Sequence, residues 1–213
     1  MPPKSPAYLG PYQRAVKQHG PGFISLLFGS REMQTRRFEV LAGCVKLAGR
    51  HLADLGCGHG DLLPWLRAQG VELGSYLGVE AMPEFVEQAR ARAYPGARFM
   101  HADFVTDEEL FDRLVGEGVD TVMFCGSLNT LDEALALRVL DRAWRALSLC
   151  ERGVLGFNFL AGGGHWPRPQ TNLPRRPTRA WFDWALARTP ELMFCQHYLG
   201  AHDATLVMTH GLF

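Results

Sequence analysis

The chain has 213 residues, 47% hydrophobic and 21% charged, which is enough for one well-packed domain. Its 22 basic and 22 acidic residues leave no net charge, which disfavours nucleic acid or an anionic membrane as a partner. The five cysteines are scattered without a Cys-x-x-Cys pair, so neither a disulfide framework nor a metal site is expected. The sequence lacks a signal-peptide core and an apolar run long enough to span a membrane, which predicts a cytoplasmic protein.

Residues 1–30 are rich in proline, glycine and aromatic side chains. We expect an irregular arm that packs on the rest of the protein or closes over it as a lid, with Tyr8, Tyr12, Phe23 and Phe28 as its aromatic residues. From residue 31, apolar residues at helical spacing predict an amphipathic helix, with Ser30 as its N-cap and Gly49 at its end. The expected organisation is therefore an arm or lid (1–30) and a single domain (31–213).

From His51 onward, short apolar runs alternate with segments of helical periodicity. Strands are expected at 51–56, 75–80, 97–104, 119–126 and 152–160, and helices at 61–69, 83–93, 107–116 and 131–149. This alternation predicts an α/β fold in which a parallel, doubly wound sheet carries helices on both faces.

The pattern changes after a loop rich in glycine, proline and arginine at 162–177. A helix is expected at 178–188, and two apolar runs at 192–199 and 204–213 are separated only by "GAHD". A parallel crossover needs a dozen or more residues, so these runs are predicted to form a hairpin. One antiparallel strand would then join an otherwise parallel sheet.

Three glycines, Gly56, Gly58 and Gly60, follow the first predicted strand in "DLGCGHGDLL". A turn without a ligand is disfavoured because each glycine costs about 0.5–1 kcal/mol where its flexibility is unused. A dinucleotide fingerprint, G-x-G-x-x-G, would place its third glycine at Asp61, whose carboxylate would repel a pyrophosphate. The pattern acidic-x-G-x-G-x-G, starting at Asp54, instead suits a ligand with a cationic centre.

This segment closely resembles motif I of the class I S-adenosylmethionine-dependent methyltransferases. The resemblance covers about residues 31–213, and "SREMQTRRFEVL" and "HYLGAHDATLVM" resemble bacterial members of unassigned substrate. It implies a Rossmann-like, seven-stranded sheet that is mostly parallel, with an antiparallel strand in the C-terminal hairpin. It also implies S-adenosylmethionine as the cofactor.

The resemblance assigns roles to residues at the ends of the predicted strands. Glu80 would accept hydrogen bonds from the ribose hydroxyls, Asp103 would lie near the adenine amino group, and Arg36 or Arg37 would pair with the methionine carboxylate unless it is simply exposed. Glu80 could alternatively be a charge that favours a helix N-terminus. The cofactor-binding residues predicted in this way are Asp54, Gly56, Gly58, Gly60, Glu80, Met82, Asp103, Phe104, Cys125 and Arg37.

The methyl acceptor should bind at the carboxyl ends of the strands. Candidate catalytic residues there are Asn129, Asn158 and His165, and an ordinary structural role is the alternative for each. Further candidates near this edge are Trp166, His197, Tyr198 and His202. The arginines at 168, 175, 176 and 179 form a basic cluster that would contact an anionic substrate or lie in a solvated loop.

Absent motifs narrow the acceptor. "CGSLN" stands where amino-methylating enzymes of DNA and RNA carry [DN]-P-P-[YF], which disfavours methylation of a base amino group. The three lysines all precede motif I, so the lysine-containing tetrad of ribose 2′-O methylases cannot form within the strands. We therefore expect methyl transfer to oxygen or nitrogen of a small molecule. The alternatives are a non-catalytic protein that binds S-adenosylmethionine or S-adenosylhomocysteine as a sensor or for partner binding and, with less support, an NAD-dependent reductase.

Overall fold

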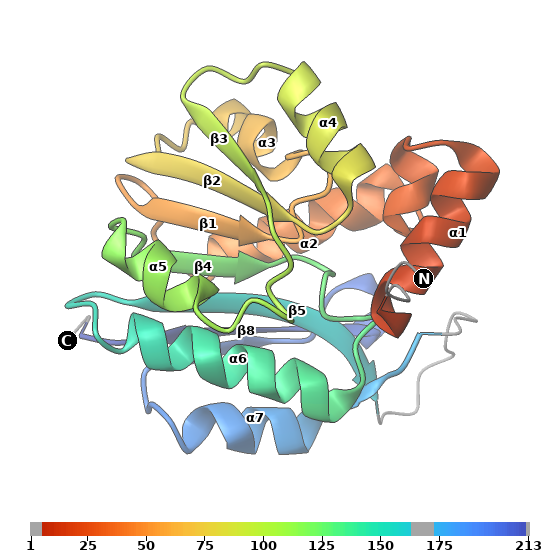
Figure 1. Ribbon diagram of the computed structural model, residues 1–213. Coiled ribbons are helices and arrows are strands. Elements are labelled where there is room, and N and C mark those ends of the chain that lie inside the picture. The colour runs from red at the N-terminus through yellow and green to blue at the C-terminus, as the bar shows by residue number, and fades with distance from the viewer. Residues whose placement is uncertain (1–5, 163–172, 212–213) are drawn as a thin grey trace.

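The computed structural model describes residues 6–162 and 173–211, which form a central twisted sheet with helices on both faces (Figure 1). The strands are β1 (His51–Leu55), β2 (Ser75–Glu80), β3 (Ala97–His101), β4 (Thr121–Phe124), β5 (Val154–Gly162), β6 (Arg176–Pro177), β7 (Leu192–Cys195) and β8 (Asp203–Thr209). The helices are α1 (Gly10–His19), α2 (Arg31–Gly43), α3 (Leu62–Ala68), α4 (Pro83–Ala91), α5 (Leu110–Gly116), α6 (Glu133–Leu147) and α7 (Thr178–Leu186). Short 3-10 turns occupy Ala7–Leu9, Phe23–Leu26 and Leu199–Ala201.

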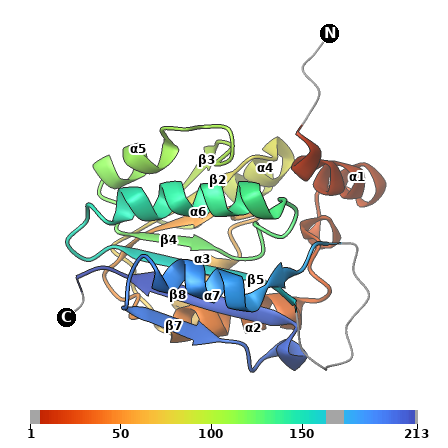
Figure 2. The same ribbon diagram turned by 90° about the horizontal axis from the view of Figure 1, so that it is seen from below.

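The strands follow the order β3-β2-β1-β4-β5-β8-β7, and β1 to β5 are parallel. β8 runs antiparallel to both of its neighbours, β5 and β7, which lie beside it in Figure 2. The predicted seven-stranded, mostly parallel sheet with its antiparallel hairpin strand is thus confirmed. The two-residue strand β6, which pairs with the end of β5, was not predicted.

The core lies in two layers because a parallel sheet is buried on both faces. Helices α5, α6 and α7 pack on one face around residues such as Phe124 and Phe157, and α2 and α3 pack on the other around Leu52 and Met123. Both layers come from the continuous apolar runs that predicted the strands.

The helix at Arg31 begins as predicted, since the Ser30 side chain accepts a hydrogen bond of 3.2 Å from the backbone N–H of Met33. The prediction that it extends to Gly49 is wrong. The helix ends at Gly43, and the chain then turns so that the Gly49 N–H reaches the carbonyl of Glu72 at 2.8 Å. Strands β3, β4 and β7 also end earlier than predicted, at His101, Phe124 and Cys195.

The expectation of an irregular N-terminal arm is also wrong, because residues 10–19 form helix α1. Pro11 stands in its first turn and Gly20, at φ 73°, ends it, as is common at the two ends of a helix. We call residues 6–30 the N-terminal arm. The arm packs on α4 through Tyr12 and Leu26, and Figure 1 shows it beside the ends of β1 and β4.

Within the described residues, no helix is long and apolar enough to cross a membrane. The same residues contain no cluster of three or more His, Cys, Asp or Glu side chains that could hold a metal ion.

Candidate active site

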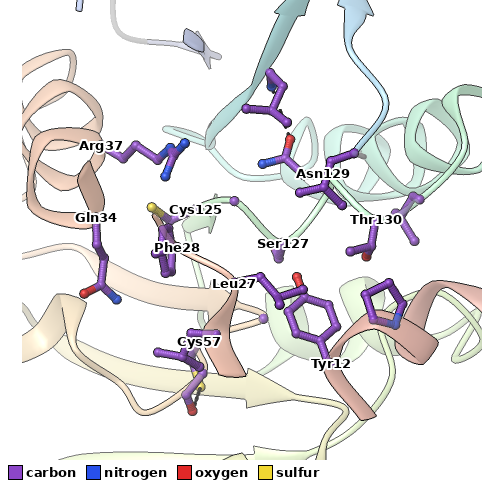
Figure 3. A pocket seen from close by; sticks show the side chains of 18 of the residues that line it. Tyr12, Leu27, Phe28, Gln34, Arg37, Cys57, Cys125, Ser127, Asn129 and Thr130 are labelled. Atoms are coloured by element: carbon purple, nitrogen blue, oxygen red, sulfur yellow. Dashed lines mark hydrogen bonds between the residues drawn. The ribbon is translucent and has the colours of Figure 1, made fainter. Parts of the chain in front are cut away.

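A cavity of about 680 Å³ lies at the carboxyl ends of the parallel strands, beneath the N-terminal arm. This volume falls within the range of about 300–1,000 Å³ that small-molecule sites occupy. Its wall includes the glycine turn after β1, the end of β2, and the loops after β3 and β4. Figure 3 shows Gln34 and Arg37 on one side of the cavity, and Asn129 and Thr130 on the other.

The glycine turn needs glycine for both conformation and space. Gly56, Gly58 and Gly60 have φ values of 71°, 54° and 72°, which favour glycine. A Cβ at Gly56 would lie 2.3 Å from the Cβ of Ser127, and one at Gly58 would lie 2.8 Å from Leu26 Cδ2. Ser127 and Leu26 therefore pack directly against the backbone of this turn, and Gly56 and Gly58 also line the cavity.

Gly60 and Asp61 lie at the outer side of the turn. A Cβ at Gly60 would meet the ring of Phe99 at 2.7 Å, so its requirement for glycine comes from packing. The Asp61 carboxylate forms an ion pair with Arg92 and accepts a hydrogen bond of 3.2 Å from Gln34. The cavity wall among the described residues includes neither Gly60 nor Asp61, so the role of Gly60 in cofactor binding stays a prediction.

Both carboxylate oxygens of Glu80, which lines the cavity, accept hydrogen bonds from backbone N–H groups. Its Oε2 accepts a hydrogen bond from the Gly58 N–H and its Oε1 accepts one from the Met82 N–H, both at 2.9 Å. Burial raises the pKa of this carboxyl, and the backbone donors oppose that shift. Each oxygen retains capacity for a further donor, such as a hydroxyl in the cavity. Met82 itself is buried against Phe85 and is absent from the described wall.

Asp54 is a second buried acid in the wall. Its Oδ2 accepts a hydrogen bond of 2.7 Å from the Tyr76 hydroxyl. Burial raises the pKa of Asp54 to about 7, and the neighbouring Glu80 and Asp61 carboxylates add to the shift. A cationic group in the cavity would stabilise the ionised form of this acid.

Asp103 and Phe104, which the family resemblance singled out, follow β3 and line the cavity. Asp103 Oδ1 accepts a hydrogen bond of 2.9 Å from the Val105 N–H, and Oδ2 accepts one of 2.6 Å from the Tyr8 hydroxyl. The Phe104 ring packs edge-to-face on Phe124. The contact from Tyr8 was not predicted, because the aromatic arm gave no indication of its target.

Arg36 and Arg37 take different positions. Arg36 is exposed and pairs with Glu39 on the same helix. Arg37 is buried in the cavity wall, where its Nε donates a hydrogen bond of 2.7 Å to Oδ1 of Asp203. The sequence did not single out Asp203. A role for Arg37 in binding the methionine carboxylate stays a prediction.

The asparagine candidates differ in their access to the cavity. Asn129 lines it, and its Oδ1 accepts a hydrogen bond of 3.2 Å from the Leu160 N–H. Asn158 is fully buried behind the loop after β4, where its Oδ1 accepts from the Gly126 N–H at 2.8 Å and its Nδ2 contacts the Cys125 sulfur at 3.5 Å. Cys125 lines the cavity, and burial raises the pKa of its thiol to about 12.

Of the hairpin candidates, His202 lines the cavity. His197 contacts the sulfur of Cys195 at 3.2 Å in an exposed position, and the buried Tyr198 hydroxyl is hydrogen-bonded to Thr205 at 2.6 Å. His165, Trp166 and Arg168 lie outside the described residues.

The predicted basic cluster does not form one surface. Arg176 is buried, contrary to either expectation, and donates to the carbonyls of Leu128 and Leu131. Arg175 lines the cavity and donates to the Ala161 carbonyl at 3.0 Å, whereas Arg179 is exposed and pairs with Asp183.

Comparison with known proteins agrees with this geometry. Residues 52–149 match the family model described as a methyltransferase domain. A putative methyltransferase of Mycobacterium tuberculosis is 27% identical over 155 residues, which cover 73% of this chain and 90% of that protein. These matches, together with the fold, support a class I S-adenosylmethionine-dependent methyltransferase.

Solved structures share the fold at low sequence identity. A Haemonchus contortus phosphoethanolamine N-methyltransferase, solved with phosphoethanolamine and S-adenosylhomocysteine, matches 95% of this chain with a TM-score of 0.68 and 14% identity. The match covers 48% of that enzyme, so the chain spans about half its length. An amino pentose methyltransferase from Micromonospora echinaspora, solved with S-adenosylmethionine bound, matches 92% of this chain and 95% of its own length, with a TM-score of 0.55 and 18% identity.

Proposed function

We propose that the protein transfers the methyl group of S-adenosylmethionine to oxygen or nitrogen of a small molecule. The main support is the buried carboxylate of Glu80, which the backbone N–H groups of Gly58 and Met82 fix at the cavity floor. A carboxylate held in this way can bind two neighbouring hydroxyls of a ribose without moving.

The remaining wall residues fit the other parts of this cofactor. Asp103 and Phe104 provide an acceptor and an aromatic ring for the adenine, and the backbone of Gly56 and Gly58 lines the cavity where the chain that joins it to the amino acid would lie. Asp54, whose pKa burial raises to about 7, suits a ligand with positive charge. When bound, the cofactor supplies a methyl group on a sulfonium, which an in-line nucleophile can take.

The task of the protein is then chiefly to align the acceptor and to exclude water. Holding two reactants in line can contribute roughly 7–11 kcal/mol to lowering the barrier. We propose that the N-terminal arm acts as the lid of this site, since Tyr8, Tyr12 and Leu26 belong to the cavity wall. A lid of this kind also limits the acceptor to a molecule that fits, together with the cofactor, within about 680 Å³.

Isothermal titration calorimetry with S-adenosylmethionine, S-adenosylhomocysteine and NADH tests the proposal. We expect binding of the two sulfur nucleotides and no binding of NADH. Glu80→Gln should weaken the binding of S-adenosylhomocysteine by at least about tenfold, because the carboxylate then becomes an amide with a single acceptor oxygen. Glu87→Gln, an exposed change on α4, is the matched control.

Binding of NADH without either sulfur nucleotide would contradict the proposal and favour a reductase. If the sulfur nucleotides bind but a broad panel of labelled small-molecule assays yields no methylated product, the protein is a sensor or partner-binding protein instead.

A further inference from the structure

We propose that Asp203 is the residue that binds the methyl acceptor, and that the acceptor presents an N–H or O–H group to its Oδ2 atom. This inference rests on the proposed methyl transfer and names the chemistry of the acceptor. It concerns the end of the cavity that the glycine turn and Glu80 do not reach.

Asp203 lies on the opposite side of the sheet centre from the predicted adenine and ribose sites. Glu80 and Asp103 belong to β2 and β3, whereas Asp203 is the first residue of β8 and pairs in register with Leu160 of β5. The strands β1, β4 and β5 stand between β2 and β8. Asp203 and Leu160 therefore wall the part of the cavity that remains for an acceptor.

The Asp203 carboxylate is only half satisfied. The residue is 1% exposed, and its Oδ1 accepts the hydrogen bond from Arg37 Nε, but Oδ2 has no hydrogen-bond partner among the described residues. A buried carboxylate oxygen without a donor is costly, so native structures rarely keep one without a purpose. A donor on a bound molecule would satisfy it. Binding then includes a small displacement of the side chains that cover this oxygen.

Arg37 keeps the carboxylate in place. Burial acts to lower the pKa of Arg37, but the charge and hydrogen bond of Asp203 help to raise it above its usual value, so the guanidinium remains protonated. The same guanidinium lies over the ring of Phe28 at 5.4 Å. Arg37 thus fixes Oδ1 and balances the charge of Asp203, which leaves Oδ2 as an acceptor for a neutral or a cationic donor.

The chain just before Asp203 is shaped for this purpose. Leu199 and Ala201 both have left-handed backbone conformations, with φ values of 48° and 58°, which are uncommon for residues with a side chain. Leu199, His202 and Asp203 all line the cavity. Asn129 lines it from the loop after β4 (Figure 3). Such strain is concentrated at sites where binding requires one particular geometry.

The competing explanation is that Asp203 binds the amino group of the cofactor itself. The two can be separated with S-adenosylhomocysteine and sinefungin, an analogue in which C–NH₃⁺ replaces the S⁺–CH₃ group. Both ligands carry the same amino acid end, but only sinefungin places an ammonium where the transferred methyl group faces the acceptor. A carboxylate on the acceptor side attracts only that ammonium.

We would measure the affinity of both ligands for the wild type, Asp203→Asn, and the double variant Arg37→Gln/Asp203→Asn. The double variant removes both charges, so no buried charge loses its partner if the single variant folds poorly. We expect the wild type to bind sinefungin at least about tenfold more tightly than S-adenosylhomocysteine. Both variants should lose this preference, and the affinity of Asp203→Asn for S-adenosylhomocysteine should change less than about threefold.

A tenfold loss of S-adenosylhomocysteine affinity in Asp203→Asn would overturn the inference, because Asp203 would then bind the cofactor. The inference would also be overturned if the wild type does not prefer sinefungin to S-adenosylhomocysteine, or if the variants keep that preference. A wild type that binds neither ligand would refute the proposed function itself, which is a distinct result.

Transfer of labelled methyl groups to two separate pools, one of amines and one of alcohols and phenols, distinguishes the two kinds of donor. Product formed in either pool by the wild type, and reduced at least tenfold in Asp203→Asn, supports the inference. Product formed equally well by the variant overturns it.

Discussion

The hydroxyl of Tyr8 donates a hydrogen bond of 2.6 Å to Oδ2 of Asp103, which joins the N-terminal arm to the loop after β3. The two residues are 95 positions apart in the chain. Burial and the Asp103 carboxylate both raise the pKa of Tyr8, so the hydroxyl keeps its proton and remains a donor. The arm is therefore fastened at the carboxyl group that we assign to the adenine.

Tyr8→Phe should loosen the arm without unfolding the domain. The loss of one hydrogen bond of this kind corresponds to about 1 kcal/mol, or roughly a fivefold rise in the open population. Limited proteolysis should cleave the arm faster by about that factor, and S-adenosylhomocysteine should restore part of the protection. Tyr94→Phe, which removes a hydroxyl outside the arm, is the control, and equal cleavage of the two variants would contradict a fastened arm.

Asp54 should make the stability of the fold depend on pH. Its pKa is about 7 in the folded protein, against about 3.9 in an unfolded chain, so the folded state binds more protons between these values. The free energy of unfolding therefore falls as the pH rises through this window and stays reduced above pH 7. Asp54→Asn lacks this titrating carboxyl group. Its free energy of unfolding relative to that of the wild type should therefore rise by on the order of 2–3 kcal/mol between pH 5 and pH 8.

Urea unfolding at the two pH values measures this difference, with Asp112→Asn as an exposed control. The comparison across pH cancels any fixed cost of the substitution at Asp54. A gap between variant and wild type that is the same at pH 5 and pH 8 would show that Asp54 does not titrate abnormally.

Replacing one partner of the ion pair between Arg37 and Asp203 should reduce the stability of the fold more than replacing both. Arg37→Met leaves a buried carboxylate without its partner, which typically costs about 3–5 kcal/mol. Arg37→Met/Asp203→Leu removes both charges and should recover most of that loss. Denaturant titration measures both, and Arg98→Met, which breaks the exposed pair with Glu117, should cost no more than about 1 kcal/mol.

Substitution by alanine should destabilise the protein more at Gly56 than at Gly96, which has a similar backbone conformation but no close neighbour. Gly56 and Gly96 have φ values of 71° and 69°, but only the Cβ at Gly56 would meet a neighbour, Ser127. Gly96→Ala should cost about 1–2 kcal/mol from its conformation alone, and Gly56→Ala about 1–3 kcal/mol more. Thermal unfolding checks the difference, and Ser127→Gly combined with Gly56→Ala should recover part of the excess. Equal costs would mean that the loop after β4 yields freely.

Local sequence signals predicted the parts of the protein that local physics determines. The spacing of apolar runs indicated β1 to β5, and the short link "GAHD" required an antiparallel hairpin. The resemblance of short motifs to class I methyltransferases pointed to Glu80 and Asp103 at strand ends, and both line the cavity. Each of these signals lies within about a dozen residues.

Contacts between distant residues could not be predicted in the same way. The pairing of Arg37 with Asp203 spans 166 positions, and nothing near either residue in the chain specifies the other. The burial of Arg176 depends on carbonyl groups of the loop after β4, which no pattern reveals. Helix α1 was missed although Tyr12 and Val16, four residues apart, form a partly buried side that packs on the cluster of Leu26, Met82 and Phe85.

The position of β8 in the chain affects how the protein is made. Arg37 emerges from the ribosome early, whereas Asp203 stands at the start of the last described strand, which inserts between β5 and β7. Domains begin to fold while synthesis continues. Arg37 therefore has no counterion in the growing chain until Asp203 and the rest of β8 have been synthesised. A chain released before β8 is made would therefore have an unfinished sheet edge, which chaperones and proteases recognise, and it would also lack Asp203 and with it the acceptor wall that we propose.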